Sequence, residues 1–500
     1  MLGTEVRRGV VAGAVAGTVL VAAMYLLGPL AGLRPLPQLL QQPLLNVMPG
    51  AVFGFLIDHL QHAGKVVEEA GLIVAELAGL AVLGGVYGAL RRRFKIPFLA
   101  LLLGGAGWLV VVMVLLPITG EGFLGLIEGV ATPLLWAVLF AVYALVLEAA
   151  HDRWLLPPPE RAEPGRRLLL TRMPVAIAGG SLLVLGVQLL PGWYQAIFNP
   201  PDRRLGGLSP ELTPVGSFYV VSKNFSDPVV DPAGWSLNVH GMVDRPQRFD
   251  LAGLHALPQT VEYVTLECIS NNVGGNQIST GQFGGTSLQS LLMLVGVQAG
   301  ASLVAFRSRD AYTESLPLSL VLQSPEILVA HSLDGGPLPT QHGFPARILV
   351  PGHYGMKGPK WLDEIEVTTG ARNGYWENQG WNPDAAIKTT SRFDLPSDGE
   401  LLKLGPVSLG GVAFAGKRGI SAVEYSTDGG GSWLQASVKP PLSELTWVTW
   451  TATWTPSAAG AYNLRVRARD GSGALQAGSA QPSYPDGSSG YHAIQVSVSH

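Results

Sequence analysis

The sequence contains a single cysteine, Cys268, among its 500 residues. One cysteine cannot close an intramolecular disulfide, supply the four thiolates of an iron–sulfur cluster or form a CxxCH haem attachment. A cofactor bound to this chain therefore uses one thiolate or none.

Charged residues are also scarce: they make up 14% of the chain, hydrophobic residues make up 47%, and the net charge is −3. A chain this apolar is not an ordinary soluble protein, and its length suggests roughly two to four domains. The C-terminal part carries no basic stripe, so we expect no nucleic acid among its partners.

The apolar residues are concentrated near the N-terminus. A membrane-spanning helix needs roughly 20 mainly apolar residues, and five stretches are near or above this length: residues 9–33, 70–90, 96–120, 129–147 and 173–198. We predict five spanning helices within a membrane domain of residues 1–198. Residues 43–60 are apolar enough for a re-entrant segment or a sixth span, but an interfacial helix agrees better with the charge pattern.

Lys and Arg accumulate on the cytoplasmic side of membrane helices. Basic residues precede the first predicted span and are clustered within residues 91–95 and 151–167. These clusters fall on one side if the N-terminus is cytoplasmic, which makes the part after about residue 198 extracytoplasmic. Arg166 and Arg167, before the last span, resemble a twin-arginine export signal, although an ordinary positive anchor gives the same pattern.

Glu76 is the only charged residue inside the predicted spans. An ionisable residue in hydrocarbon is a functional candidate, yet a protonated and internally hydrogen-bonded Glu explains it equally well. Facing histidines for a membrane haem are absent from the predicted spans, so the membrane domain is interpreted as an anchor or docking platform.

The C-terminal part contains two kinds of pattern. Up to about residue 385, short β-like runs alternate with Gly/Pro turns, and residues 286–297 and 316–323 look helical, which predicts an α+β domain over residues 199–385. Residues 386–500 contain period-2 strands at about ten-residue intervals, which is typical of an immunoglobulin-like β-sandwich. We expect STDGGGSW to form a hairpin there, with Trp433 in the core.

Cys268 ends one predicted strand and enters the turn ISNNVGGN. Glycines in such a turn let the backbone approach a ligand closely. Three interpretations of the thiol remain open: an inert buried side chain, a nucleophile that needs a neighbouring His, and a metal ligand beside a bulky cofactor.

Residues 342–367 carry several basic side chains among glycines and prolines: His342, Arg347, His353, Lys357 and Lys360. Such groups suit a phosphate, whereas a solvated basic loop is the plainer alternative, and spacing alone does not decide between them.

Several motifs together resemble a known family. TLECISN, HGFPARILVPGHYGMKGPKWL, GYWENQGW, ISAVEYSTDGGGSW and NLRVRARDGSG occur in the order, and roughly at the spacings, of the sulfite oxidase family of molybdenum enzymes. The resemblance covers about residues 215–500, through the molybdopterin domain and the immunoglobulin-like domain that mediates dimerisation in sulfite oxidases. It makes a five-span, membrane-anchored bacterial member plausible.

The resemblance implies a molybdopterin cofactor with Cys268 as the one protein thiolate on molybdenum. It also implies a set of residues that contact the cofactor: Asn224, Phe225, Ser308, His342, Arg347, Gly355, Met356 and Lys357. Among these, His342 and Arg347 match the pair that binds the pterin and its phosphate, and the run from Gly355 to Lys357 matches the phosphate cradle.

The sequence departs from sulfite oxidases at the expected substrate position. Lys223 replaces an arginine, His331 stands where we match an active-site tyrosine, and Asn272 with Val273 replaces an arginine pair. Lys lacks the fork that grips an oxyanion, and His supplies a group that titrates near neutral pH. These departures argue against sulfite as the physiological substrate.

The sequence therefore predicts a membrane-anchored, extracytoplasmic molybdenum oxidoreductase that transfers an oxygen atom to or from a small substrate, with Cys268, Lys223 and His331 as catalytic residues. Electrons would pass to or from a separate cytochrome or quinol system, and a homodimer is possible. The alternative is a non-catalytic membrane scaffold or adhesion protein that uses the immunoglobulin-like domain.

Overall fold

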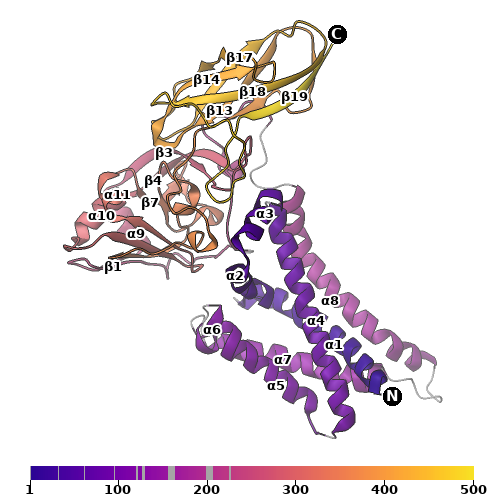
Figure 1. Cartoon of the computed structure of the whole chain (residues 1–500). Helices are drawn as coiled ribbons and strands as arrows, with labels where there is room; N and C mark the ends of the chain where they lie inside the picture. The colour runs from indigo at the N-terminus through magenta and orange to yellow at the C-terminus, as the bar shows by residue number, and fades with distance from the viewer. Residues whose placement is uncertain are drawn as a thin grey trace. The chain divides into compact units, whose positions relative to one another are not determined.

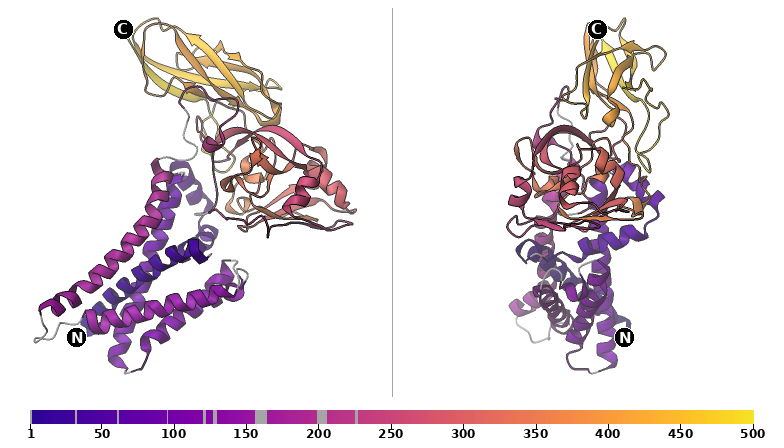
Figure 2. Two further views of the ribbon diagram at one scale, coloured as in Figure 1. Left: turned by 180° about the vertical axis from the view of Figure 1, so that it is seen from behind. Right: turned by 90° about the vertical axis from the view of Figure 1, so that its left-hand side faces the viewer.

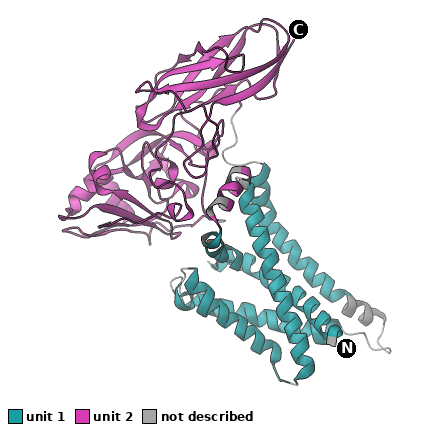
Figure 3. Ribbon diagram, in the orientation of Figure 1, with its two compact units in different colours: residues 1–48, 61–199 teal, residues 49–60, 200–500 magenta. Residues whose placement is uncertain are grey.

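The computed structural model describes residues 2–31, 33–60, 62–94, 96–119, 122–126, 130–155, 164–198, 206–224 and 227–500. The chain forms two compact units (Figure 3): residues 1–48 with 61–199, and residues 49–60 with 200–500. The helical unit and the strand-rich unit are described separately below.

The helical unit contains several long apolar helices (Figure 1). Its helices are α1 (Leu2–Ala31), α2 (Leu36–Val47), α4 (His62–Arg93), α5 (Leu99–Val110), η1 (Val111–Leu115), α6 (Leu116–Ile118), η2 (Phe123–Gly125), α7 (Ala131–Ala149), η3 (Ala150–Trp154) and α8 (Pro164–Phe198). The turns η1 and η3 are π-helical and directly continue α5 and α7.

Within the described ranges, 5 helices are long and apolar enough to cross a membrane: Gly3–Gly28, Ala63–Arg93, Leu99–Ile118, Ala131–Trp154 and Arg172–Phe198. They correspond one to one with the five predicted spans. The ambiguous stretch 43–60 is not among them, because the helix breaks at Met48 and Pro49 into the end of α2 and the 11-residue α3 (Gly50–Leu60).

Small residues let α1 and α4 pack backbone to backbone. A Cβ built on Gly84 would lie 2.3 Å from the carbonyl oxygen of Gly9, and one on Gly13 would lie 2.6 Å from the carbonyl oxygen of Leu80. Such close approach is the usual basis of helix association in a membrane. Along the same helix, neither carboxylate oxygen of Glu76 has a hydrogen-bond partner within the described part, so the expected internal hydrogen bond is not present.

Two sheets form the first part of the strand-rich unit. One has the order β2-β1-β10-β5-β6, and the other has β3-β4-β7-β8 with β9 paired to β7. The strands are β1 (Leu237–Gly241), β2 (Gln247–Phe249), β3 (Thr260–Glu267), β4 (Ile278–Ser287), β5 (Leu303–Ser308), β6 (Thr313–Pro317), β7 (Leu328–Leu333), β8 (Gly336–Pro337), β9 (Arg347–Leu349) and β10 (Leu362–Thr368).

Short helices accompany these strands: α9 (Leu251–Ala256), α10 (Leu288–Val295), α11 (Leu318–Gln323), and the 3-10 turns η4 (Val215–Ser217), which precedes β1, η5 (Thr340–His342), η6 (Gly355–Lys357) and η7 (Glu377–Gln379), which follows β10. α10 and α11 confirm the two predicted helical stretches. They pack their apolar faces, including Leu291, Leu292 and Val321, into one core with strand residues such as Val239 and Ile365.

The last part of the chain is a β-sandwich, whose layers are visible in Figure 2. One sheet has the order β11-β13-β17-β16 and the other β12-β19-β18-β14-β15. The elements are β11 (Thr390–Leu395), β12 (Leu401–Lys403), β13 (Val407–Phe414), η8 (Gly416–Arg418), β14 (Ile420–Ser426), β15 (Leu434–Gln435), β16 (Ser437–Val438), β17 (Val448–Trp454), β18 (Gly460–Asp470) and β19 (His492–Ser499).

Alternating burial explains how the two sheets share one core. Every second residue of β18 from Leu464 to Asp470 is buried, and residues from both sheets, such as Trp450 and Val466, meet in the core. The predicted hairpin forms between β14 and β15. The prediction for Trp433 was wrong, because it lies half-buried at the surface under the Arg467 guanidinium, 3.9 Å from the ring centroid. The immunoglobulin-like type of the sandwich and the boundary near residue 385 stay predictions.

Candidate active site

Cys268 is the first residue after β3, at the start of a turn that returns as β4. Its backbone N–H donates to the carbonyl oxygen of Gln277 at 2.9 Å, which closes the turn. Its Sγ lies 3.0 Å from Ser270 Oγ, and that hydroxyl donates to Gln277 Oε1 at 2.9 Å. The side chain is only partly buried, so the thiol is not enclosed in the core.

The C-terminal sandwich and the segment before β19 hold this turn in place. Ser488 Oγ donates to the carbonyl oxygen of Asn271 at 2.7 Å, and Arg392 donates to that of Gly275 at 2.6 Å. Gly274 has φ +76°, and a Cβ there would lie 2.3 Å from the His492 ring. The glycine permits a close approach, as the sequence suggested, but the group that approaches Gly274 is a side chain of this same chain.

Two buried residues, Glu267 and Tyr219, lie between Cys268 and the 3-10 turn η6. Glu267, directly before the cysteine, accepts from Asn271 Nδ2 at 2.9 Å, and burial raises its pKa to about 7. Burial and the neighbouring Cys268 raise the pKa of Tyr219 above its usual value. A Cβ on Gly355 would lie 2.8 Å from the Tyr219 hydroxyl. Gly355 is therefore the residue that allows η6 to come this close to the cysteine turn.

A basic cluster lies on η5, β9 and the segment before β10. Arg347 is buried and donates to the carbonyl oxygens of His342 at 3.3 Å and Gly358 at 3.2 Å. Lys360 donates to the carbonyl oxygens of Val221 at 3.0 Å and Gln341 at 2.9 Å. The bonds of Arg347 go to uncharged carbonyl oxygens, and a buried guanidinium of this kind suits an anion.

His342 belongs to the same cluster. Burial, followed by the charges of Arg347 and Lys360, lowers its pKa to about 3, so the imidazole is neutral at physiological pH. Its Nε2 is buried and has no hydrogen-bond partner within the described part of the chain. Lys360 was in the basic stretch that the sequence singled out but not among the expected cofactor residues, and its contact with the Gln341 carbonyl brings it next to His342.

The side chain of Lys357 has a different environment from the one expected. Its Nζ lies 2.9 Å from Glu314 Oε1 and 2.5 Å from Glu377 Oε1, and all three side chains are at most 6% exposed. The two carboxylates raise the pKa of this lysine against the effect of its burial. These two carboxylates occupy the Lys357 ammonium group, so its side chain is held inside the fold, and its place in the phosphate-cradling run stays a prediction.

Lys223 and Asn224 lie against residues that follow β5. Lys223 Nζ is 3.8 Å from Asp310 Oδ2 and 5.2 Å from the Tyr375 ring centroid, and Asn224 Nδ2 donates to the same Asp310 oxygen at 2.9 Å. Phe225, the next expected contact, lies outside the described residues.

Tyr312 connects this group to η6 and to β5. Its hydroxyl donates to the carbonyl oxygen of Met356 at 2.6 Å, and its carbonyl oxygen accepts from the N–H of Ser308 at 2.9 Å. The Tyr312 N–H also donates to Asp310 Oδ1 at 3.1 Å, so contacts join Ser308, Met356 and the Lys223 group, and Gly355 next to Met356 leads to the cysteine turn.

His331 does not join this group. Its Nε2 contacts Gln259 Oε1 at 2.6 Å, and its ring centroid lies 4.2 Å from that of His255. Gln259 precedes Thr260 at the start of β3, whereas Cys268 follows the end of the same strand. At about 3.3 Å per residue the strand separates these ends by about 23 Å. The expectation that His331 lines the substrate position beside Cys268 is therefore corrected: the match to a single tyrosine did not reveal at which end of the sheet it falls.

Several buried polar atoms near these residues have no partner within the described part. They include Ser308 Oγ, His342 Nε2 and the indole Nε1 of Trp381. A buried polar group without a hydrogen bond costs about 1–3 kcal/mol. Ser308 and His342 were expected cofactor contacts, so a polar group bound here would satisfy the atoms that the protein leaves unsatisfied. Trp381 ends the motif GYWENQGW, to which the sequence gave no site residue. Its buried N–H has no partner within the described part, and burial of this kind is visible only in the fold.

A partly exposed thiol, the buried His342 and Arg347, and unsatisfied buried polar atoms are groups that suit an anionic cofactor carrying a soft metal. Residues 224–376 match the family described as the oxidoreductase molybdopterin binding domain. The sulfite oxidase of Arabidopsis thaliana is 30% identical over 48% of this chain and 73% of its own length.

Two further relatives also match this chain. The mitochondrial sulfite oxidase of Mus musculus is 29% identical over 50% of this chain, which spans only 54% of the mouse protein. A putative protein-methionine-sulfoxide reductase subunit, YedZ1, of Azospira oryzae is 33% identical over 38% of this chain and 70% of its own length. The chain belongs to the sulfite oxidase family of molybdopterin-dependent oxidoreductases. It is a molybdenum-dependent oxidoreductase, and its cofactor is Mo-molybdopterin.

Proposed function

We propose that this oxidoreductase transfers an oxygen atom to or from a small oxidised sulfur or nitrogen compound. The observation that carries the proposal is that the same domain holds a partly exposed Cys268 and two buried polar atoms, Ser308 Oγ and His342 Nε2, without partners within the described residues. The name of the Azospira relative, a putative protein-methionine-sulfoxide reductase subunit, favours a sulfur oxide. In the reductive direction, an oxide with two protons and two electrons gives the reduced compound and water.

The residues divide into three roles. Cys268 ligates molybdenum, and the cofactor supplies the two-electron couple and an oxygen position for exchange. His342, Arg347 and Lys360 bind the pterin and its phosphate, with Ser308 and Asn224 as further polar contacts and the backbone of Gly355 to Lys357 beside them. Lys223 faces the substrate, and it presents a single ammonium group rather than the planar fork of an arginine, which suits a less anionic substrate than sulfite.

Location is the second part of the proposal. The five apolar helices support a multi-pass membrane protein with its N-terminus in the cytoplasm and the catalytic part outside. The side chains of Arg166 and Arg167 lie outside the described residues, and their role as a twin-arginine export signal is part of this proposal. Replacing both with Lys should leave the catalytic part protected from external protease in spheroplasts. Unchanged digestion by that protease would contradict the export role.

Electron exchange is proposed with a separate cytochrome or a membrane quinol. The chain offers one cysteine, which rules out a cluster of its own with four thiolates. A homodimer through the sandwich rests on the family resemblance only. A non-catalytic scaffold is not favoured, because it would leave the thiol and the basic cluster without a use.

The proposed activity is tested with detergent-solubilised full-length protein of known molybdenum content. Reduced benzyl viologen serves as electron donor for methionine sulfoxide, dimethyl sulfoxide and trimethylamine oxide, and ferricyanide serves as acceptor for sulfite. We expect turnover with at least one oxide. Turnover with sulfite alone would contradict the proposed substrate class, and no turnover in molybdenum-loaded protein would contradict the function.

A further inference from the structure

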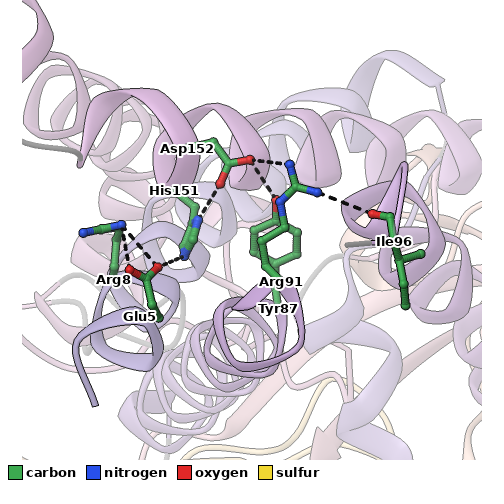
Figure 4. A network of polar contacts seen from close by, with 7 residues as sticks. All are labelled: Glu5, Arg8, Tyr87, Arg91, Ile96, His151 and Asp152. Carbon is green, nitrogen blue, oxygen red and sulfur yellow. Dashed lines mark hydrogen bonds and ion pairs between the residues drawn. The ribbon is translucent and has the colours of Figure 1, made fainter. Parts of the chain in front are cut away.

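The helical unit contains a second polar site, which the oxidoreductase function does not use. Three separate segments meet there: the first turns of α1, the last turn of α4 and the π-helical turn η3 (Figure 4). They line an open hollow of about 530 Å³ with polar side chains only: Thr4, Glu5, Arg8, Arg91, Arg92, His151 and Asp152.

Five charged groups of this hollow form one network (Figure 4): Glu5, Arg8, Arg91, His151 and Asp152. Arg8 lies 3.2 Å from both carboxylate oxygens of Glu5. His151 stands between two carboxylates, with Nδ1 2.6 Å from Asp152 Oδ1 and Nε2 3.4 Å from Glu5 Oε2. Asp152 Oδ2 accepts from Arg91 at 3.2 Å. The network therefore connects α1, α4 and η3 through charge.

Cations outnumber anions in the hollow. Three arginines face two carboxylates, so the lining carries a charge of +1 with His151 neutral and +2 with His151 protonated. Arg92 also lines the hollow, is exposed, and takes no part in the network drawn in Figure 4. Guanidinium groups bind phosphate through two parallel N–H donors. The excess positive charge and the exposed Arg92 therefore favour an anionic ligand.

His151 supplies an independent reason to expect a ligand. Its side chain is 3% exposed, and within the described part of the chain its Nε2 makes no hydrogen bond, since the Glu5 carboxylate at 3.4 Å forms an ion pair without hydrogen-bond geometry. The Asp152 carboxylate can only accept, so Nδ1 carries the ring proton of a neutral His151, and Nε2 is a donor only in the charged imidazolium. A bound anion would accept from Nε2 in that charged form. A network that only joins the helices would need neither an open hollow nor Arg92.

The position of the hollow identifies the source of the anion. The apolar spans Gly3–Gly28, Ala63–Arg93 and Ala131–Trp154 all contribute to it from one of their ends. The ends of membrane spans lie at the level of the lipid headgroups, where basic pockets between helices bind anionic lipids. We propose that this hollow binds the phosphate group of an anionic phospholipid and thereby holds α1, α4 and η3 together.

The test uses detergent-solubilised full-length protein and native mass spectrometry. Phosphatidylglycerol is offered in competition with phosphatidylcholine of the same acyl chains. We expect preferential retention of phosphatidylglycerol, and about tenfold weaker retention in Arg92→Gln, since one charge-assisted contact is lost. Arg92→Gln is the first choice because Arg92 is exposed and outside the network. Arg153→Gln, an exposed arginine of η3 that does not line the hollow, is the matched control and should retain the lipid.

Equal retention of the two lipids would overturn the proposal, and so would identical behaviour of Arg92→Gln and the control. Inorganic phosphate at millimolar concentration provides a further arm: full displacement of phosphatidylglycerol would show a site for free phosphate and overturn the lipid assignment. A Glu5→Gln variant should strengthen retention, because it removes a competing carboxylate. None of these outcomes depends on molybdenum, so failure here is distinguishable from failure of the proposed function.

Discussion

At the scale of single residues, the chemistry depends on what surrounds each group. Cys268 is accessible because β3 ends directly before it, and its turn is fixed by hydrogen bonds from Ser488 and Arg392, far along the chain. The sequence alone identified Cys268 because the chain has no other cysteine. It did not separate Lys357 from Lys360, because the carboxylates that neutralise Lys357 lie 43 and 20 residues away in sequence.

Cys268→Ser removes the one thiolate that the chain offers to the metal. We expect turnover to fall below about 1% of the wild-type value, because the oxygen donor is harder and tunes the metal couple differently. X-ray absorption at the molybdenum edge should show one sulfur ligand fewer. Undiminished turnover, or an unchanged sulfur shell, would contradict the assignment of Cys268 as ligand.

His331→Phe tests the corrected position of that residue. Because His331 lies at the far end of β3 from Cys268, we expect turnover per molybdenum to stay within about twofold of the wild type. Its pKa, lowered to about 4 by burial and by His255, should also leave the pH profile of turnover unchanged above pH 5. A loss comparable to that of Cys268→Ser would return His331 to the active site.

Glu267 gives a stability that depends on pH. Burial raises its folded pKa to about 7, above its ordinary value of 4.5, so the folded state holds a proton that the unfolded state has released between these values. The free energy of unfolding should therefore fall as pH rises from about 4.5 to about 7, by up to about 3 kcal/mol. Glu267→Gln, which keeps the acceptor for Asn271, should flatten this dependence in calorimetry at pH 5 and pH 8.

The exposed Glu444→Gln is the matched control for that comparison. A slope that survives in Glu267→Gln but disappears in Glu444→Gln would show that Glu267 is not the titrating group.

At the scale of elements, the period and the length of apolar runs predicted most of the helices and strands. The apolar runs became five spans, α10 and α11 formed where expected, and β18 alternates as a half-buried strand should. Register did not follow from these patterns. The pairing of Thr260 with Gly285 and of Glu267 with Ile278 places His331 and Cys268 at opposite ends of one sheet, and this depends on which strands become neighbours.

Lys357→Met tests how η6 and η7 are joined. It would leave Glu314 and Glu377 buried beside each other without their cation, and breaking a buried ion pair costs about 3–5 kcal/mol. We expect a decrease of that order in the free energy of unfolding, measured with urea. The triple variant with Glu314→Gln and Glu377→Gln should recover most of it, and the exposed Lys403→Met should change little. Equal stability of Lys357→Met and Lys403→Met would show that the buried pairs contribute nothing.

At the scale of the whole molecule, one chain combines a helical unit that can cross a membrane with a strand-rich unit that carries the cofactor site. The sequence indicated this division through hydropathy alone. The membership of α3 in the strand-rich unit was not visible in it, because a short apolar helix gives the same pattern in either environment.

The central claim is that the strand-rich unit holds one Mo-molybdopterin beside Cys268. Metal analysis of purified, folded full-length protein, produced in cells that make the cofactor, tests this most directly. The account predicts about one molybdenum per chain, whereas folded protein without molybdenum would contradict it.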